Sequence, residues 1–376
     1  MSKGKVVVAM SGGVDSSVAA ALLQQQGYEV IGMMLRLWSE PGREAANRCC
    51  TPEAMNIARR VAGQLGIPFY AVNAQETFRN VVVQYFLDGY ASGGTPNPCL
   101  ACNRQIRWEF LLERALALGA DYMATGHYVR LVREAGQPVR LFEAVDGHKD
   151  QSYVLHVLDQ AKLEHALFPL GELTKPEVRQ IAAELKLPAA VSKESQDLCF
   201  LAGQDYRGFL QRHQPLLAEP GPIVDRAGHR LGEHSGLANY TIGQRKGLGI
   251  AAAEPLYVLA KDRTRNALIV GHGHELGSRE LVTGPANWLS GTAPTRPFDA
   301  QVKIRYSARK APAHVMPIAG SRARVVFAEP ARDITPGQAA VFYVDGEVLG
   351  GGLIESGEIP ENAQAPLQGS QRVPVL

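Results

Sequence analysis

Short apolar runs alternate with amphipathic helical patterns along residues 1–186. The apolar runs are typical of strands that are buried on both faces, and the helical patterns end near glycine or proline. The predicted strands cover residues 5–10, 28–35, 69–72 and 122–125. The predicted helices cover the segment from Val18 to Gly27 and residues 52–65, 104–118 and 175–186. This order predicts a parallel sheet with helices on both faces.

From about residue 220 the pattern changes to short apolar runs separated by turn dipeptides. Runs such as 323–327 and 339–344 show this style, and helical periodicity is weak. Strands broken by turns predict one or two small β barrels. We therefore expect three domains, namely a Rossmann-like α/β domain over residues 1–205, a small mixed or β central domain over 206–280, and a C-terminal β barrel over 281–376.

The bulk composition is that of a soluble globular protein, with 45% hydrophobic and 20% charged residues in a chain of 376. No apolar run has the length that spans a bilayer. The first eight residues enter a predicted strand directly and lack the features of a signal peptide. We expect a cytoplasmic protein without a membrane partner. The tail after Ile359 is rich in Pro, Gln and Gly, and we expect it to be loosely ordered.

Positive charge is concentrated in the second half of the chain, although the formal net charge of the whole is only +2. Residues 201–330 hold 17 Lys and Arg against 10 Asp and Glu. Such a stretch could serve a polyanionic partner, or it could be a solvated basic surface, and the charge alone does not decide between them.

The chain has five cysteines, and an odd number without a signal peptide argues against a structural disulfide framework. Cys99 and Cys102 lie in a turn-rich segment, 95–103, before a predicted helix. That helix N-terminus, together with Arg104 and Arg107, would favour a thiolate at Cys102. Cys49 and Cys50, which are adjacent, are interpreted as structural or incidental.

Cys102 and Cys199 together suit sulfur transfer. One thiol can carry a persulfide, and the other can free its sulfur by forming a disulfide. A competing interpretation makes Cys99, Cys102 and Cys199 three ligands of an iron–sulfur cluster, whose fourth iron stays open for sulfide. A closed zinc site needs four ligands, and the sequence shows no obvious fourth. Both sulfur chemistries remain open on the sequence.

The turn Ser11-Gly-Gly-Val-Asp-Ser-Ser17 follows the first predicted strand and opens the first predicted helix. Its glycines let the backbone approach a phosphate, and its amides and the helix N-terminus can bind the anion. Asp15 would repel a phosphate, which suggests that it holds Mg²⁺ or caps the helix. No Walker A lysine follows. The string resembles the pyrophosphate loop of ATP pyrophosphatases that adenylate a substrate oxygen.

An ordered set of motifs over nearly the whole chain resembles the tRNA-specific 2-thiouridylase family. The motifs are Ser11–Ser17, Thr95–Pro98 with Cys102-Asn103, Thr125–Tyr128, Lys149–Tyr153, Asp197–Phe200, Gly243–Gly249, Arg305-Tyr306 and Thr335–Gln338. The resemblance implies an α/β fold of the adenine nucleotide alpha hydrolase type, and ATP-dependent replacement of the C2 oxygen of the wobble uridine by sulfur in tRNAs for Lys, Glu and Gln. It implies ATP and Mg²⁺ as cofactors, and a cysteine desulfurase or a sulfur-relay protein as donor.

The same resemblance assigns roles to individual residues. Cys102 would be the nucleophile, and Cys199 would be the persulfide carrier that pairs with it in a disulfide. Residues that would bind ATP are Ala9, Met10, Ser11, Gly12, Gly13, Val14, Asp15, Ser16, Leu35 and Gly126. Residues that would face the target base are Asn97, Pro98 and Cys99. Residues that would touch tRNA are His127, Lys149, Asp150, Gln151, Arg305, Tyr306 and Gln338.

This chain departs from the family at position 99, where many members carry Asp and this sequence has a thiol. The departure argues against a carboxylate role there, and it favours the [4Fe-4S] alternative for this chain. Three rival functions share some of these features: a small-molecule adenylating ligase, a thiolase for another tRNA base, and a non-enzymatic RNA-binding protein. The ligase needs neither the three thiols nor a basic β region, and the binding protein would release no pyrophosphate.

Overall fold

A computed structural model describes residues 2–42, 51–192, 198–201 and 203–357. Five parallel strands form its first sheet, in the order β3-β2-β1-β4-β7. They are β1 (Lys5–Ala9), β2 (Glu29–Arg36), β3 (Phe69–Asn73), β4 (Tyr122–Ala124) and β7 (Ala166–Leu167). The predicted parallel sheet is therefore confirmed. The predictions for Cys49, Cys50 and the tail after Ile359 lie outside the described residues.

The central strand β1 is buried on both faces, and after Lys5 all of its residues are apolar. In β1, Val6 and Val8 face a cluster that includes residues of α1, α2 and α9, while Val7 faces a second cluster that includes Trp108 and Met123. The helices of the first cluster are α1 (Val14–Gln25), α2 (Pro52–Leu65) and α9 (Lys175–Glu184). A strand that is buried on both faces reads as a continuous apolar run. This explains why the hydrophobic pattern located it.

The helices begin and end at the signals that the sequence provides. Thr51 caps α2, its hydroxyl accepting from the Ala54 N–H at 3.1 Å, and Gly66 ends the helix with a φ of 65°. Thr174 and Glu177 form a capping box at the start of α9. A glycine with positive φ after the last turn is a common helix end, because it has no Cβ that would clash.

The predicted helix over residues 104–118 starts earlier than expected. A continuous helical stretch consists of α5 (Pro98–Ala101), the π-helical η3 (Cys102–Leu111) and α6 (Leu112–Ala117). Asn97 is its N-cap, with the side-chain oxygen accepting from the Cys99 N–H at 3.1 Å, and Pro98 takes the first helical position. Both residue types are favoured at these positions. Cys102 therefore lies inside the helix, and Cys99 lies in its first turn.

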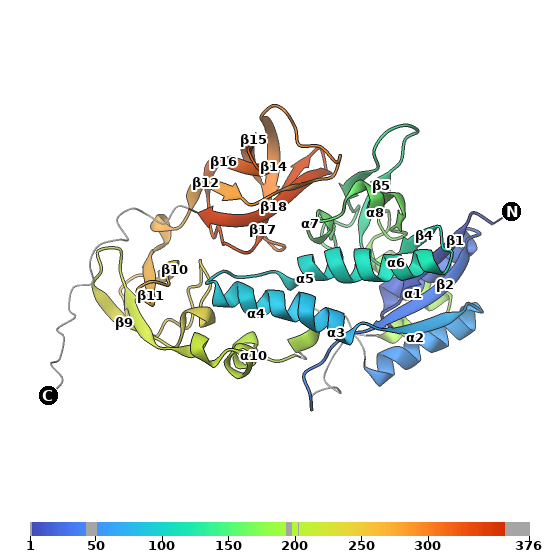
Figure 1. Ribbon diagram of the computed structural model, residues 1–376, viewed down its shortest axis with the longest axis horizontal. Helices are drawn as coiled ribbons and strands as arrows, with labels where there is room; N and C mark the ends of the chain where they lie inside the picture. The colour runs from blue at the N-terminus through green and yellow to red at the C-terminus, as the bar shows by residue number, and fades with distance from the viewer. Residues whose placement is uncertain (1, 43–50, 193–197, 202, 358–376) are drawn as a thin grey trace.

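Two β structures follow the α/β part. The central sheet has the order β10-β11-β8-β9; β8 and β11 are parallel, and the other pairs are antiparallel. Its strands are β8 (Gly221–Val224), β9 (Arg230–His234), β10 (Leu256–Asp262) and β11 (Ala267–His272). In Figure 1 this sheet lies on the left, the C-terminal strands lie at the top, and α1 and α2 lie on the right. The prediction of a mixed central region is confirmed.

Six antiparallel strands close into the C-terminal barrel, because the first pairs with the last. They are β12 (Ser278–Thr283), β14 (Phe298–Lys303), β15 (Ala311–Ile318), β16 (Arg322–Ala331), β17 (Ala339–Val344) and β18 (Glu347–Gly357). Closure encloses a core that includes Val302, Val315 and Phe327. The predicted C-terminal β barrel is therefore confirmed.

A hairpin from the α/β part extends the barrel sheet. It consists of β5 (Val129–Val132) and β6 (Arg140–Glu143), and β6 pairs with β18 through Phe142 and Glu347. The Tyr153 hydroxyl bonds both the N–H and the carbonyl of Ala339, each at 3.1 Å. One apolar cluster also runs from Val7 into the barrel strands. The hydrophobic pattern did not indicate this join.

The remaining helices and short strands connect these parts. They are α3 (Gln75–Phe78), η2 (Arg79–Val83), α4 (Gln84–Ala91), α7 (Ser152–Leu155), α8 (Gln160–Glu164), η4 (Pro188–Val191), η5 (Cys199–Leu201), α10 (Tyr206–His213), η6 (Pro215–Ala218), η7 (Leu237–Asn239), η8 (Gly273–Glu275) and β13 (Asn287–Trp288). Among the described helices, none combines the length and the apolar character that crossing a bilayer requires.

His156 makes the join between the two parts sensitive to pH. It is buried, and burial lowers its pKa from 6.5 to about 4, although its bond to the Tyr153 carbonyl opposes the shift. Between these values the unfolded chain binds more protons than the folded one. The free energy of unfolding should therefore fall as the pH is lowered from about 6.5 to about 4, with His156 contributing up to about 1.4 kcal/mol per pH unit. Urea unfolding at several pH values measures this slope. His156→Gln should be less steep than the wild type in this window, and equal slopes would contradict the assignment.

Candidate active site

The glycine turn lies where the order of the parallel strands reverses. The chain passes from β1 to β2 and β3 on one side, and β4 pairs with β1 on the other. Crevices at such switch points, beyond the carboxyl ends of the strands, are where open α/β sheets bind ligands. The two loops at this crevice are the turn after β1 and the segment Thr125–His127 after β4.

Gly126 lies against the start of α1, and Gly12 lies against α2, so closely that a side chain would fit at neither position. A Cβ on Gly126 would lie 2.8 Å from the Asp15 carbonyl carbon and from the Ser16 nitrogen. Gly12 has a φ of +76°, and a Cβ there would lie 2.4 Å from the Ala54 carbonyl oxygen. Both glycines are thus required by space, and Gly12 also by its backbone conformation.

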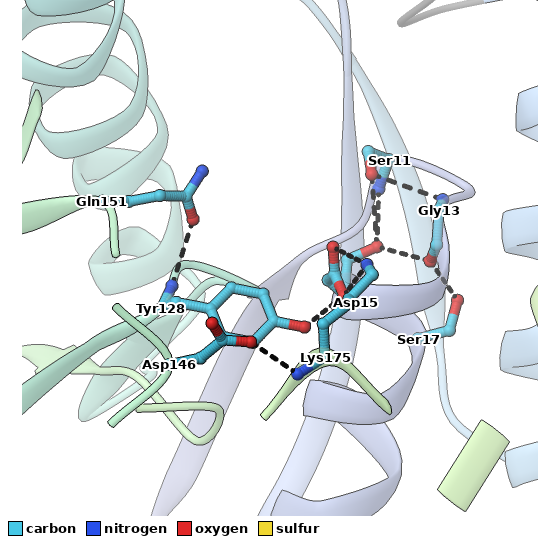
Figure 2. A network of polar contacts seen from close by, with 9 residues as sticks. Ser11, Gly13, Asp15, Ser17, Tyr128, Asp146, Gln151 and Lys175 are labelled. Atoms are coloured by element: carbon cyan, nitrogen blue, oxygen red, sulfur yellow. Dashed lines mark hydrogen bonds and ion pairs between the residues drawn. The ribbon is translucent and has the colours of Figure 1, made fainter. Parts of the chain in front are cut away.

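The turn is held by its own serines. The Ser16 hydroxyl accepts from the Ser11 N–H at 3.1 Å and donates to the Gly13 carbonyl at 3.2 Å, and the Ser17 hydroxyl donates to the same carbonyl at 2.8 Å. Figure 2 shows these contacts around the start of α1. Gly13 is the N-cap of α1 and has no side chain to accept from the first-turn N–H groups. Those amides and the positive end of the helix can therefore receive an anion.

Asp15 does not cap the helix, which corrects one of the two roles suggested for it. It lies in the first turn of α1, and its carboxylate accepts from the Lys175 ammonium at 2.6 and 2.8 Å and from the Tyr128 hydroxyl at 2.8 Å. Tyr128 belongs to a motif that the sequence analysis singled out. Lys175 did not stand out, because its contact with Asp15 joins residues far apart in the chain.

The turn fits the phosphates of a nucleotide, and Asp15 fits Mg²⁺ that the nucleotide helps to hold. Mg²⁺ usually takes one or two carboxylates, with phosphates and waters as its other ligands. Within the described ranges, no group of three or more His, Cys, Asp and Glu side chains could hold a metal ion by itself. A magnesium ion shared with a nucleotide needs only one such carboxylate.

The other predicted ATP residues lie at the same edge of the sheet. Ala9 ends β1 and Met10 follows it in the core, while Leu35 is the penultimate residue of β2. Leu35 packs against the cluster that includes Val7 and Trp108, and also against another apolar cluster, around Phe86 and Phe200. Through Leu35, the end of β2 therefore packs against the same cluster as two of the cysteines.

Cys102 and Cys199 both pack against the cluster around Phe86 and Phe200, although they lie far apart in the sequence. Cys102 begins η3 and Cys199 begins η5, and both side chains are half-buried. Cys99 is exposed in the first turn of α5. No disulfide joins the three cysteines in the described part of the chain. The fold thus gathers the two thiols that the sequence suggested as a pair.

A pocket beside the cysteines contains several residues predicted to face the target base or tRNA. Its volume is about 440 Å³, and its lining includes Asn97, Pro98 and Gln338, together with Leu198 next to Cys199. The Gln338 amide donates to the Thr95 carbonyl at 2.7 Å, which ties the barrel to the loop before α5. Tyr90 and Tyr206 also line the pocket, with stacked rings whose centroids are 5.2 Å apart. An aromatic pocket of this kind suits a planar base.

Of the residues predicted to touch tRNA, His127, Asp150 and Gln151 form hydrogen bonds with their neighbours in the α/β part. His127 is buried; Arg107 donates to its Nε2 at 2.8 Å, so its Nδ1–H donates to Thr125. Burial, together with Arg107, holds the pKa of His127 well below 6.5, so it is neutral at pH 7. Asp150 is buried and accepts from Ser152 at 2.7 Å, and burial raises its pKa. Gln151 accepts from the Tyr128 N–H at 3.1 Å.

The other residues predicted to touch tRNA differ in their exposure to solvent; they are Lys149, Arg305, Tyr306 and Gln338. Tyr306 is 44% exposed, and burial, Asp150 and Cys99 together raise its pKa, which places it near Cys99. Arg305 donates to the Ile242 carbonyl at 2.9 Å and to Thr335, and Lys149 is half-buried. Gln338 lines the pocket. The role of all seven in tRNA binding stays a prediction.

The basic loop Gly243–Gly249 presents its charges to solvent. Arg245 and Lys246 are exposed, while Gly243 packs so tightly that a Cβ would lie 1.9 Å from Asp333 Oδ1. An exposed pair of cations on a fixed turn is consistent with phosphate contacts and equally with a surface turn.

Comparison with known families divides the chain into three matched segments. The descriptions of the matching families are tRNA methyl transferase HUP domain for residues 4–203, tRNA methyl transferase PRC-barrel domain for 207–272, and aminomethyltransferase beta-barrel domain for 278–354. A solved structure, the U34-tRNA thiolase NcsA from Methanococcus maripaludis with its [4Fe-4S] cluster, is 21% identical, with a TM-score of 0.35. It covers 57% of this chain and 67% of its own, and a likeness this low carries no functional argument.

Curated relatives match over nearly their full length. The tRNA-specific 2-thiouridylase MnmA of Magnetococcus marinus is 49% identical over 353 residues, which are 93% of this chain and 98% of the relative. The protein of the same name from Roseiflexus castenholzii is 49% identical over 366 residues, covering 93% and 99%. With the glycine turn and the thiols in the places that the motifs predicted, this chain belongs to the tRNA-specific 2-thiouridylase family.

Proposed function

We propose that this protein uses ATP to replace the C2 oxygen of the wobble uridine with sulfur in tRNAs for Lys, Glu and Gln. The observation that carries the proposal is the 49% identity to 2-thiouridylases over 93% of the chain. The structure supports it with a pyrophosphate-type turn and two half-buried thiols connected by one apolar cluster.

Activation of the uridine is the first step of the proposed reaction. The C2 oxygen attacks the α-phosphorus of ATP, and pyrophosphate leaves with the electron pair of the broken P–O bond. The amides of Gly12 and Gly13 and the first turn of α1 would hold the leaving phosphates. Mg²⁺ bound by Asp15 and by the phosphates would neutralise part of their charge. The adenylated oxygen is then a good leaving group.

Sulfur transfer follows at C2. A persulfide on Cys199, supplied by a cysteine desulfurase or a sulfur-relay protein, provides the sulfur. Either its outer sulfur attacks C2, and Cys102 then attacks the Cys199 sulfur of the resulting Cys199–S–S–C2 link, which forms the Cys102–Cys199 disulfide and frees the sulfur on C2. Or Cys102 attacks the inner sulfur of the persulfide first, forms the same disulfide and releases hydrosulfide that attacks C2. AMP leaves in both cases, and a thiol reductant later reopens the disulfide. The packing of both thiols on one cluster supports this pairing.

The substrate is proposed to lie across the pocket and the barrel. The base would enter the pocket beside Asn97 and Pro98, and stacking on aromatic rings would hold it there. Tyr306 and Lys149 would reach the tRNA directly, whereas the internally bonded His127 and Asp150 would fix the loops that carry such contacts.

The proposal is tested by pyrophosphate release with defined transcripts. With ATP and Mg²⁺, a tRNA-Glu transcript bearing U34 should stimulate release strongly. The same transcript with C34 should not, because cytosine keeps the C2 oxygen but has an amino group at C4 and no N3–H, so a pocket that reads the uracil edge would not position it. Mass spectrometry of the digested tRNA should then show 2-thiouridine once a persulfide donor is added. Equal release with both transcripts, or release without any tRNA, would refute the assigned substrate.

A further inference from the structure

The proposed reaction uses Cys102 and Cys199 and leaves Cys99 without a role. Cys99 and Cys102 are separated by two residues, Leu100 and Ala101, at the start of one continuous helical stretch. Cys99 is exposed, whereas Cys102 is half-buried. Two cysteines with this spacing at the start of a helix are typical of dithiol sites that form and release a disulfide. The third thiol therefore lies where it can exchange with the second.

The helix brings Cys99 and Cys102 to a separation that a disulfide can span. Cys102 has a φ of −61° and a ψ of −47°, which are α-helical, so its Cα lies about 5 Å from that of Cys99. Disulfides join residues whose Cα atoms are about 4.4–6.8 Å apart. Residues three positions apart also share one face of a helix. A Cys99–Cys102 disulfide is therefore compatible with this backbone.

The disulfide that sulfur transfer leaves behind is less accessible. Cys102 and Cys199 pack against the cluster around Phe86 and Phe200, and both side chains are half-buried. A thiolate reduces a disulfide only when it can approach one of the sulfurs, so this pair disfavours a bulky protein reductant. Cys99 is the exposed one among the three described cysteines. Exchange with Cys99 would carry the disulfide from the cluster to the surface.

We propose that Cys99 is a resolving thiol, which takes over the disulfide from Cys199 after each sulfur transfer and presents it to a dithiol protein reductant. The Cys99 thiolate attacks the Cys102 sulfur, the Cys102–Cys199 bond breaks, and Cys199 leaves as a thiolate with the electron pair. One disulfide replaces another, so this step needs neither an oxidant nor a reductant. Cys199 is then ready for the next persulfide sulfur.

Reduction follows at the exposed sulfur. A thiolate of the reductant attacks Cys99, and Cys102 leaves as a thiolate. The second thiol of the reductant loses its proton to solvent, attacks the mixed disulfide and releases Cys99, so the reductant supplies both electrons. The inference deepens the proposed function and rests on its persulfide route, in which the Cys102–Cys199 disulfide forms. Under the iron–sulfur route Cys99 would be a cluster ligand and would not exchange.

The test first asks where the disulfide lies after one reaction cycle. Wild type and Cys99→Ser each complete one cycle with tRNA, ATP and a persulfide donor but no reductant, and the donor and tRNA are then removed. Alkylation and peptide mass spectrometry locate the disulfide. Wild type should contain the Cys99–Cys102 disulfide, and Cys99→Ser should contain only Cys102–Cys199. Because Cys99 is exposed, the serine variant should fold.

The second measurement compares two reductants on these oxidised proteins. Reduced thioredoxin is a dithiol protein that needs an accessible sulfur, whereas a small phosphine reaches the half-buried pair directly. Relative to the phosphine rate, thioredoxin should reduce Cys99→Ser at least about tenfold more slowly than wild type. The ratio of the two rates within each protein cancels other effects of the substitution. Cys99→Ser/Ala101→Cys is the matched control, because adjacent residues do not face each other on a helix, and it should stay slow.

Two results would overturn the proposal while the proposed function stands. One is a wild-type protein that completes the cycle without any Cys99–Cys102 disulfide. The other is an equal ratio of rates in wild type, Cys99→Ser and the matched control, since the position of the third thiol would then not matter. If Cys99→Ser instead forms no 2-thiouridine in the first cycle and wild type holds stoichiometric iron, the persulfide route itself fails, and the inference fails with it.

Discussion

Replacing Cys199 by serine is expected to abolish thiolation of tRNA, by roughly a thousandfold or more, because no other group carries the persulfide in the proposed reaction. Pyrophosphate release that depends on U34 should survive, since adenylation uses the turn rather than the thiol. The two readouts, 2-thiouridine by mass spectrometry and pyrophosphate by an enzymatic assay, therefore separate in this variant. Full thiolation by Cys199→Ser with a persulfide donor would refute the persulfide route.

Cys99→Ser is the matched control, because Cys99 is exposed and lies one helical turn from Cys102. The persulfide route leaves this variant active. The iron–sulfur route requires Cys99 as well as Cys102 and Cys199, so all three serine variants would then lose thiolation. Iron and sulfide analysis of anaerobically purified protein gives an independent answer, since only the cluster route predicts stoichiometric iron.

Gly126→Ala is expected to reduce ATP affinity at least about tenfold, because the added methyl group would push the loop after β4 away from the start of α1. The new Cβ would lie 2.8 Å from the Asp15 carbonyl carbon and the Ser16 nitrogen, and backbone atoms cannot yield as a flexible side chain can. Overpacking of this kind also typically costs about 1–3 kcal/mol of stability.

Gly147→Ala provides the control for this change. Gly147 also lies in a loop, but a Cβ there would meet nothing within 4 Å. Its ATP affinity should equal that of the wild type in the same calorimetric measurement. If Gly126→Ala bound ATP as tightly as the control, the loop after β4 would have no part in the nucleotide site.

The elements that could be predicted from the sequence are those whose signals are local. Strand β1 carries the continuous apolar run Val6–Ala9 because both of its faces are buried, and Gly66 ends α2 with a positive φ. The start of the helix at Pro98 could have been found from the same kind of signal. Asn97 and Pro98 are a favoured N-cap and first residue, but in a segment with several turn formers they were interpreted as a loop.

In the candidate site, too, the features that could be predicted are those with a local sequence signal. The turn Ser11–Ser17 carries its chemistry in one continuous string, so its place after a strand was predictable. Lys175 reaches Asp15 across 160 positions of sequence, and no periodicity records such a contact. The pairing of Cys102 with Cys199 came from their chemistry and the family resemblance, and the fold then placed both on one apolar cluster.

The hairpin β5–β6 has a consequence for how the chain folds during synthesis. Strand β6 pairs with β5 within the hairpin, and its other edge meets β18 only at Glu347, about 200 residues later. Ala339 and Val341 of the barrel also complete a core that begins at Val7. At typical rates of translation the ribosome needs roughly 10–40 s to make that intervening chain. For this time the edge of β6 that faces away from β5 has no β18 to pair with, and an exposed strand edge invites association with other chains. The nascent protein is thus most exposed to aggregation while the barrel that will cover this edge is still being translated.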